Sequence, residues 1–381
     1  MEKVWKFAQK NHRLLIGIGL IALSVGLALF TEHSPYIVMA VTTALTATDL
    51  TLVDIAKRSK DGVMLPVVEA LQQRNGLLQS MVWKQGNTDT GHQVASRNSL
   101  PSVSWVRYND GVLPSKSTVD TFTERTGILE GLSSVDKRVA QVNGNEAAFR
   151  ASEDDAFLAA MANTLESAFF YESTKINPER ILGLSPRLGL STAGYGNQII
   201  KAQTADTSAN MASVWLVGWG ERTVYGITPR GQPTGLEMED KGEIRDKDTT
   251  TGAIKYKYET LFRWRCGLCV EDYRYVVRIA NVSVPTLTVD AATGADLVRN
   301  MVKAYWQIYD PRSVRLAWYC NRTIGSFLHQ QALSKTYNST LSIDPAPMLG
   351  APGIFGQPIV RALGFPIYVS DALINTEPYV N

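Results

Sequence analysis

The sequence is poor in the residues and motifs from which enzymes and disulfide frameworks are built. Its 381 residues include only three cysteines and four histidines. An odd number of cysteines in a long chain argues against a disulfide framework. No Gly-Lys pair is present, which excludes a P-loop, and neither an HExxH helix nor a G-x-S-x-G turn occurs. We therefore predict no catalytic, cofactor or metal site, and a protein that is not an enzyme.

An excess of charge of one sign is also missing. Thirty-eight basic residues face thirty-six acidic ones, which leaves a formal net charge of +2. A protein that gripped nucleic acid over much of its surface would be far more basic, so contact with nucleic acid should be weak and non-specific. Apolar residues make up 45% and charged residues 19%, which is typical of a globular chain.

Two features that resemble chemical sites have plainer explanations. Cys266 and Cys269 have CxxC spacing, but they lie in a strand-like run, Leu261–Val270, where residues three apart point to opposite faces. No second pair completes a zinc site, so we predict packing cysteines. Asp154 and Asp155 are adjacent on a predicted helix and diverge by about 100°, which predicts a solvated face instead of a paired-carboxylate site.

The first 38 residues differ from the rest of the chain. Leu14–Phe30 carries no charge and follows a basic flank that begins at Lys3. The pattern is consistent with a signal anchor, with a removed signal peptide cut near Val38–Ala40, or with a dispensable extension upstream of a true start at Met39. The sequence leaves these three interpretations open, and residues 39–381 contain no other candidate membrane span.

The segment from Trp83 to Glu130 is polar and contains few large apolar residues for its length. Short alternating runs flank Asn109-Asp110-Gly111, a turn signal between antiparallel strands. A hairpin of this composition buries little core of its own. Its strand-like alternation favours a hairpin that lies on another molecule over a disordered segment.

A long amphipathic helix is predicted from Asn145 to Tyr171. Asn145 suits the N-cap, acidic residues occupy the early turns, and apolar residues recur at helical spacing as a packing seam. Asn321 suits the N-cap of another helix, which ends near Leu333. The remaining elements are expected at Val214–Trp219, Thr223–Thr228, Leu261–Val284 with breaks near Gly267 and Glu271, Val314–Cys320, Ile359–Leu363 and Ile367–Ser370 (strands) and at Gly294–Ile308 (helix).

Arginine and aromatic residues are interleaved in the long strand region. They are Arg263, Arg265, Arg274 and Arg278, together with Trp264, Tyr273 and Tyr275. Such a mixture could stack on nucleic acid, but the same residue types are enriched at protein interfaces, and we favour an interface.

Glycosylation patterns occur at Asn281, Asn321 and Asn338. We attribute them to chance, because two of the three fall in or beside predicted core elements.

Seven stretches are long enough to suggest a family. They are LTLVDIAKR (Leu50–Arg58), VVEALQQRNGLLQSMVW (Val67–Trp83), LPSVSWVRYNDGVLPSKS (Leu100–Ser117), GLSSVDKRVAQVNGN (Gly131–Asn145), FRASEDDAFLAAMANTLESAFFY (Phe149–Tyr171), VWLVGWGERTVYGITPRG (Val214–Gly231) and YRYVVRIANV (Tyr273–Val282). They resemble the major capsid proteins of tailed bacteriophages of the Hong Kong 97 type, and in particular the capsid subunits of podoviruses similar to epsilon fifteen. The resemblance covers about residues 47–369.

The resemblance implies an α+β fold of the Hong Kong 97 type. After the apolar extension (1–38), the expected parts are an N-terminal arm with short helices (39–82), an extended β-hairpin or E-loop (83–130), a peripheral domain with a long spine helix (131–184 and 247–289), and an axial domain (185–246 and 290–381). Some members of the wider fold weld subunits through a lysine–asparagine bond. Lys84 and Lys116 are present, but nothing identifies such a pair, so this chemistry is not carried over.

The implied function is self-assembly into the icosahedral head shell that encloses a phage genome. The implied location is the virion, after assembly in the host cytoplasm. The expected partners are copies of the chain in hexamers and pentamers, possible scaffolding, portal and decoration proteins, and packaged DNA through weak non-specific contact. A membrane would be a partner only if Leu14–Phe30 is a genuine anchor.

Three other functions remain open on the sequence alone. A nanocompartment shell of the encapsulin type would share the fold but enclose enzymes. A membrane-anchored surface protein would use Leu14–Phe30. A non-catalytic nucleic-acid binder would use the arginine and aromatic residues of the strand region.

Overall fold

The computed structural model describes residues 59–60, 63–64, 75–142, 145–189, 195–203, 210–232, 235–247, 252–287, 297–333, 341–344 and 359–381. The chain divides into two compact units, Met1–Pro66 with Val135–Gly144 and Val67–Ser134 with Asn145–Asn381. In the smaller unit, β1 (Ser59–Lys60) and β2 (Val63–Met64) form an antiparallel pair, and Asp136 caps α6 (Lys137–Ala140). The segment Leu14–Phe30 lies outside the described residues. No helix within the described ranges has the length and apolar character needed to cross a membrane.

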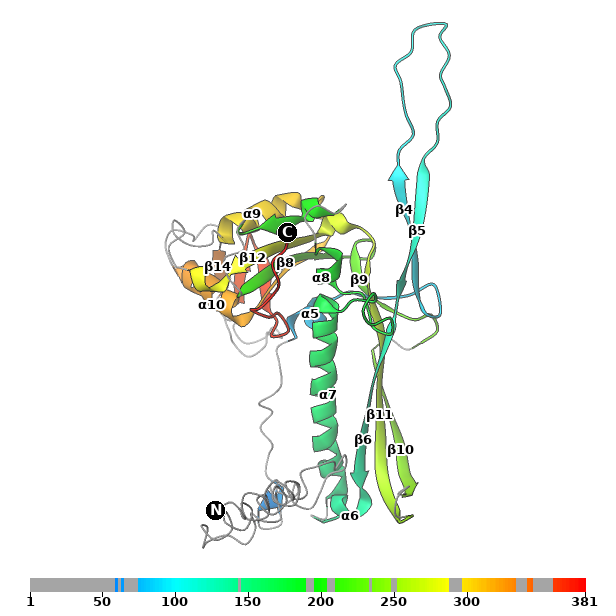
Figure 1. Cartoon of the computed structure of the whole chain (residues 1–381), viewed down its shortest axis with the longest axis vertical. Coiled ribbons are helices and arrows are strands. Elements are labelled where there is room, and N and C mark those ends of the chain that lie inside the picture. Colours follow the sequence, from blue (N-terminus) through cyan, green and yellow to red (C-terminus); the bar gives the residue numbers. More distant parts are fainter. Residues whose placement is uncertain are drawn as a thin grey trace, which may run out of the picture. The chain divides into compact units, whose positions relative to one another are not determined.

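A mixed sheet forms the centre of the larger unit (Figure 1). Its main path follows the order β10 (Leu236–Lys247), β11 (Ile254–Val270), β9 (Val224–Thr228), β8 (Met211–Trp219), β13 (Arg315–Cys320), β16 (Phe365–Val369), β15 (Ile359–Ala362) and β14 (Leu341–Asp344). Off this path, β12 (Val276–Ser283) pairs with β8 and with β7 (Ile199–Lys201), β3 (Trp83–Gln85) pairs with β9, and β6 (Gly127–Asp136) pairs with β11. Parallel pairs such as β13–β16 and antiparallel pairs such as β8–β12 coexist in this sheet.

The core lies around β8 and β12. Both strands are buried along their whole length, as expected for central strands that are covered on both faces. Helix α9 (Leu297–Gln307) packs against β12 and β7, and α10 (Arg322–Leu333) packs against β14, β15 and β16. Figure 1 shows these two helices on opposite sides of the sheet. The Asn321 side chain accepts a hydrogen bond from the Ile324 N–H at 2.8 Å, which confirms the predicted N-cap.

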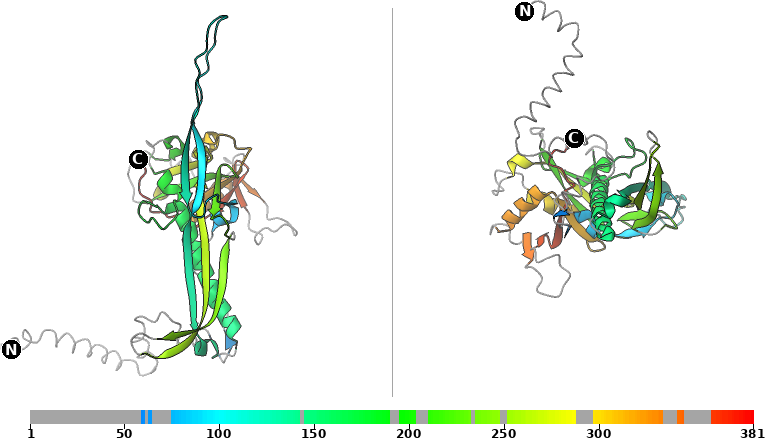
Figure 2. Two further views of the ribbon diagram at one scale, coloured as in Figure 1. Left: turned by 90° about the vertical axis from the view of Figure 1, so that its right-hand side faces the viewer. Right: turned by 90° about the horizontal axis from the view of Figure 1, so that it is seen from below.

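Helix α7 (Glu146–Tyr171) runs beside β6, β10 and β11 (Figures 1 and 2). Asn145 Oδ1 accepts a hydrogen bond from the Ala148 N–H at 3.1 Å, so the predicted N-cap is confirmed. Along the seam, the Phe157 ring stacks on Phe262 of β11, with the ring centroids 6.1 Å apart. The predicted seam is therefore the contact between this helix and the strands beside it.

The hairpin predicted between Trp83 and Glu130 is present, with narrower limits. Strands β4 (Gly91–Ser99) and β5 (Thr118–Arg125) pair with each other as a separate two-stranded sheet. Figure 1 shows this hairpin extending away from the large sheet. The following strand, β6, returns along α7 and pairs with β11.

Two local predictions were wrong. β11 continues through Gly267 instead of breaking there, because Gly267 pairs with Ile227 of β9 and keeps the ladder intact. The predicted break near Glu271 is confirmed, since a 3-10 turn at Tyr273–Tyr275 separates β11 from β12. Asp154 was expected on a solvated face, but it is buried, with only 9% of its surface exposed, because this part of α7 packs on β6 and the Ser133 hydroxyl hydrogen-bonds the carboxyl group.

Candidate assembly site

The tip of the β4–β5 hairpin carries a group of exposed apolar side chains, which we call the tip cluster. Its members and their exposed fractions are Leu100 (76%), Val103 (93%), Trp105 (105%), Tyr108 (101%), Val112 (63%) and Leu113 (88%). Soluble monomers rarely leave so many large apolar side chains together in solvent, and such clusters mark interaction surfaces. The cluster spans the stretch between the two paired strands, Leu100–Ser117.

The two arms of the tip are held together loosely. Asp110 N–H donates to the Arg107 carbonyl at 3.1 Å, and the Ser115 hydroxyl donates to the Ser102 carbonyl at 2.8 Å. Asn109 adopts a left-handed conformation (φ 72°), which asparagine tolerates well, so the predicted turn at Asn109 is confirmed. The regular β4–β5 ladder ends at the Ser99–Thr118 pair.

The root of the hairpin, in contrast, is packed against the body. Val94 of β4 and the partly buried Phe122 of β5 join a small core with Tyr225, Ile227 and Cys269. The ring of His92 meets Tyr225 edge-on, with the centroids 5.8 Å apart. Burial, with the positive charge of Lys84 as a further cause, lowers the pKa of His92. These contacts favour a neutral packing histidine at the root.

A buried ion pair ties the hairpin to α8 (Leu184–Arg187). The Arg187 guanidinium donates to both carboxylate oxygens of Glu124 on β5, at 2.5 and 2.8 Å, and the two side chains are 3% and 8% exposed. Burial alone would lower the pKa of Arg187, but its hydrogen bond and attraction to Glu124 outweigh burial and raise it. The Arg187 guanidinium therefore stays positively charged in this buried pair.

The arginines of the long strand region are engaged within the subunit. Arg263 pairs with Glu130, Arg265 with Glu237 and Gln232, Arg274 with Asp272, and Arg278 with Glu377. Because Arg278 is 2% exposed, it takes no part in a surface for nucleic acid or protein. The interface and nucleic-acid interpretations are thus wrong for Arg278, and the interface interpretation stays a prediction for the other three.

Arg278 instead anchors the C-terminal segment. Its guanidinium donates to Glu377 at 2.8 Å, to Ser213 at 3.0 Å and to the Leu188 carbonyl at 2.9 Å. The Tyr171 hydroxyl at the end of α7 donates to the other Glu377 oxygen at 2.6 Å. Burial and the Glu377 carboxylate raise the pKa of Tyr171, so its hydroxyl stays protonated as a donor. These contacts fasten the end of the chain across the core.

A second buried carboxylate, Glu166 on α7, joins three segments. It accepts hydrogen bonds from the N–H groups of Leu77 and Leu78, at 3.1 and 3.4 Å, and from the Ser370 hydroxyl at 2.5 Å. Burial raises its pKa. The N–H donors belong to the first turn of α5 (Gly76–Ser80), so Glu166 links α7 to this short helix and to Ser370.

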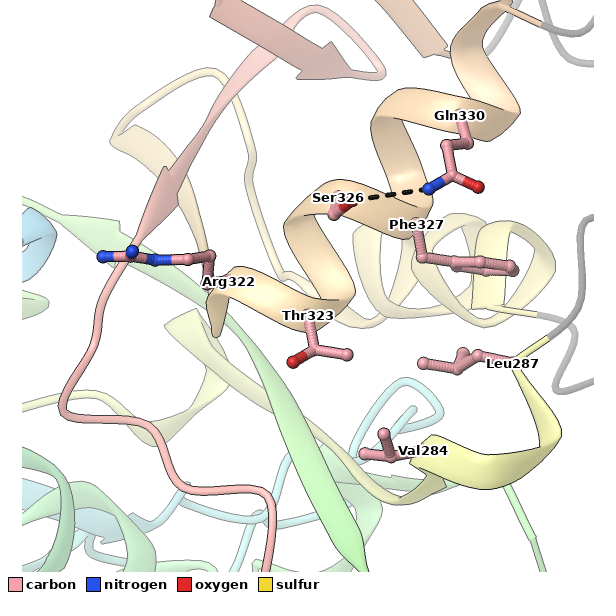
Figure 3. A pocket seen from close by; sticks show the side chains of 7 residues that line it. All are labelled: Val284, Leu287, Arg322, Thr323, Ser326, Phe327 and Gln330. Carbon is pink, nitrogen blue, oxygen red and sulfur yellow. Dashed lines mark hydrogen bonds between the residues drawn. The ribbon is translucent and has the colours of Figure 1, made fainter.

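A hollow of about 440 Å³ lies beside α10 (Figure 3). It is lined by Val284, Leu287, Arg322, Thr323, Ser326, Phe327 and Gln330. The apolar side chains Val284, Leu287 and Phe327 lie on one side, while Arg322 points away and pairs with Asp371. Among these described lining residues, no nucleophile lies beside a base.

The remaining candidates for chemistry are packing residues. Cys266 and Cys269 are free and buried in different clusters, so the predicted opposite orientations are confirmed. Burial raises the pKa of Cys266 to about 12 and that of Cys269 to about 11, which makes both thiols poor nucleophiles.

Asn281 and Asn321 are 1% and 3% exposed, which excludes glycosylation of the folded chain there; Asn338 lies outside the described residues. Within the described ranges, no three His, Cys, Asp or Glu side chains are placed to hold a metal ion.

Comparison with solved structures identifies the fold. The chain is similar to the near-atomic structure of bacteriophage Epsilon15, with 31% identity over 89% of this chain and 99% of that chain and a TM-score of 0.67. Further matches are the bacteriophage JBD30 capsid (10% identity, 90% and 99% of the two chains, TM-score 0.46) and the SrpI encapsulin complex of Synechococcus elongatus (11% identity, 60% and 95%, TM-score 0.36). The fold is thus that of a Hong Kong 97-like phage capsid subunit.

The family follows from the sequence. A family model described as major capsid protein GP7 matches residues 59–381, and the chain belongs to this family. It is therefore a structural protein of the icosahedral phage head, located in the virion, which self-assembles into capsomers. No curated protein matches the sequence. Sequence reasoning found the hairpin and the long helix that characterise the subunit, but it missed the Glu124–Arg187 and Arg278–Glu377 pairs, which join single residues far apart in the chain.

Proposed function

We propose that the tip cluster is the principal contact that each subunit makes across a neighbouring copy within hexamers and pentamers of the head shell. The observation that supports this is the exposure of Val103, Trp105 and Leu113, each at least 88% exposed, on a hairpin that pairs with no other strand of its own described chain. Burial of three such side chains stabilises an interface by several kcal/mol at roughly 1.5–3 kcal/mol each. Because a closed shell repeats the contact many times, modest affinity per copy is sufficient.

The domain division is part of the same proposal. Residues 83–130 would form the E-loop, 131–184 and 247–289 the peripheral domain, and 185–246 and 290–381 the axial domain. The strand pairing favours two changes in the bounds of the peripheral and axial domains. β10 pairs with β11 along most of its length, so it fits the peripheral domain, and β12 pairs with β8, so it fits the axial domain. Residues 39–82 would form the arm, and scaffolding, portal and decoration proteins and packaged DNA remain proposed partners.

The test is a triple substitution of the tip in the full chain, Val103→Ser, Trp105→Ser and Leu113→Ser. Under conditions where the wild type forms closed shells in electron micrographs, we expect the variant to remain as folded subunits or single capsomers by sedimentation. The matched control changes three polar residues of the same segment, Ser102→Ala, Ser104→Ala and Lys116→Ala, and should form shells. Normal shells from the apolar variant would overturn the proposal.

A further inference from the structure

The hairpin leaves the body where a hinge would be expected. β4 and β5 belong to a sheet of their own, and each continues into a strand of the large sheet through a short connection. A two-stranded ribbon attached by two such connections would ordinarily swing relative to the body, because few contacts resist bending there. The contacts at the root therefore decide whether the tip has a fixed direction.

Backbone segments at the root approach each other too closely for side chains. A Cβ atom on Gly91 would lie 2.1 Å from the Glu124 carbonyl oxygen, and one on Gly86 would lie 2.3 Å from the Gly91 carbonyl oxygen. On the body side, a Cβ on Gly267 would lie 2.6 Å from the Arg125 carbonyl oxygen. Glycine permits these approaches. The Gly91 contact holds β4 and β5 together, whereas the Gly86 and Gly267 contacts join the hairpin to the rest of the chain and leave it little room to tilt.

The Arg187 side chain adds hydrogen bonds at this junction. Besides its two bonds to Glu124, it donates to the carbonyl oxygens of Leu182 at 3.1 Å and Leu268 at 3.2 Å and to the Tyr273 hydroxyl at 3.3 Å. One guanidinium thus connects β5, the segment before α8, β11 and the turn that follows β11. Because the pair is buried, swinging the hairpin outward would leave an unpaired charge in the protein interior, which is strongly unfavourable.

We propose that Glu124 and Arg187 are positioning residues that fix the direction of the β4–β5 hairpin in the free subunit, so that the tip cluster is presented in the geometry that the next copy accepts. A bidentate carboxylate–guanidinium pair suits this role, since its planar fork fixes both distance and angle. The effect on assembly rests on the proposed function of the tip, whereas the fixed direction of the hairpin does not.

The experiment measures hairpin direction and shell assembly in the same full-length variants. Spin labels on Ser96→Cys in β4 and Lys303→Cys in α9 report the distance between hairpin and body in dispersed subunits; the native cysteines are buried. Glu124→Gln should broaden a narrow distance distribution. It should also slow shell formation about tenfold or more, because only the fraction of subunits in the competent direction can add. Arg187→Lys keeps the positive charge but loses the planar bidentate geometry. It should also broaden the distance distribution and slow assembly, and it serves as the test if Glu124→Gln folds poorly.

The matched control is Glu377→Gln, which removes one partner of an equally buried pair, 2% and 3% exposed, away from the hairpin. It should leave the distance distribution narrow. Two results would overturn the fixed direction of the hairpin: an unchanged distribution in both Glu124→Gln and Arg187→Lys, or equal broadening in Glu377→Gln. Broadening with wild-type assembly rates, while the triple tip variant fails to form shells, would overturn the link between hairpin direction and assembly. These outcomes differ from failure of the proposed function, which the triple tip variant alone decides.

Discussion

Two long hairpins of this subunit use their apolar residues in opposite ways. The β10–β11 hairpin places Phe262 against Phe157 of α7, where it is fully buried, and its edge strand β10 is mostly charged. The β4–β5 hairpin leaves Trp105 and Leu113 in solvent. Charges on an edge strand discourage pairing with other chains, while exposed apolar side chains favour association. The first hairpin thus serves the fold of its own subunit, and we infer that the second serves contacts between subunits.

Truncation of the buried aromatic should produce the largest effect. Phe262→Ala is expected to lower the free energy of unfolding of the dispersed subunit by about 3–5 kcal/mol, because it removes a fully buried ring and leaves a cavity. Urea unfolding followed by circular dichroism measures this loss. Tyr256→Ala, on the same strand but 48% exposed, is the control and should cost much less. Equal losses in the two variants would contradict the division of roles.

Substitution at the point where the two hairpins meet should have the next largest effect. The Cβ atom of Gly267→Ala would lie 2.6 Å from the Arg125 carbonyl oxygen, and relief of this overlap is expected to cost about 1–3 kcal/mol. Gly111→Ala at the hairpin tip is the control, since no atom lies within 4 Å of its added Cβ. Thermal unfolding of both variants tests the contrast. A neutral Gly267→Ala would show that the root is looser than the structure indicates.

Much of this division could be predicted from the sequence, because it rests on local patterns. The Asn145 cap and apolar seam predicted α7, and the polar run around Asn109 predicted a hairpin without a core of its own. The limits of that hairpin were set too wide, since β6 also alternates polar and apolar residues but belongs to the sheet beside α7. Periodicity identifies a strand, whereas its partner depends on the whole fold.

The contacts that position the hairpin could not be predicted in the same way. Glu124 and Arg187 are 63 residues apart, and each taken alone is an ordinary charged residue in a polar context. Gly267 suggested a strand break, although the glycine is required by close approach of another backbone segment. Asp154 was expected on a solvated face, because adjacent aspartates on a helix diverge and do not form a paired site, but Ser133 of β6 hydrogen-bonds its buried carboxyl group. In each case the deciding partner lies far away in the sequence.

Substitution of Asp154 should have a smaller effect on folding stability, and the size of this effect should depend on pH. Burial raises its pKa above the ordinary value of 3.8, and the Ser133 hydrogen bond opposes this only in part. The folded state therefore holds this proton to higher pH than the unfolded state, so the contribution of Asp154 is fully present below pH 3.8 and is lost as the pH rises through the raised pKa. The stability of the wild type relative to Asp154→Asn should accordingly fall between pH 4 and 7, by about 1.4 kcal/mol for each unit of pKa shift. Urea unfolding over this range measures the difference, and Asp155→Asn, at the exposed neighbouring position, is the control. If the stability of the wild type relative to Asp154→Asn instead rose with pH, the raised pKa of Asp154 would be contradicted.

The smallest effect on stability should come from the most exposed aromatic. Trp105→Ala removes a side chain with no described covering contact, so the free energy of unfolding of the dispersed subunit should change by less than about 0.5 kcal/mol. The same substitution should raise the subunit concentration at which shells first form, measured by light scattering, because the lost burial weakens every copy of the contact. The two variants thus test the two hairpins by different measurements. Phe262→Ala should reduce folding stability, whereas Trp105→Ala should reduce assembly at unchanged stability. A Trp105→Ala subunit that unfolds more easily but assembles at the wild-type concentration would mean that the tip folds back on its own chain, and the contrast between the hairpins would then fail.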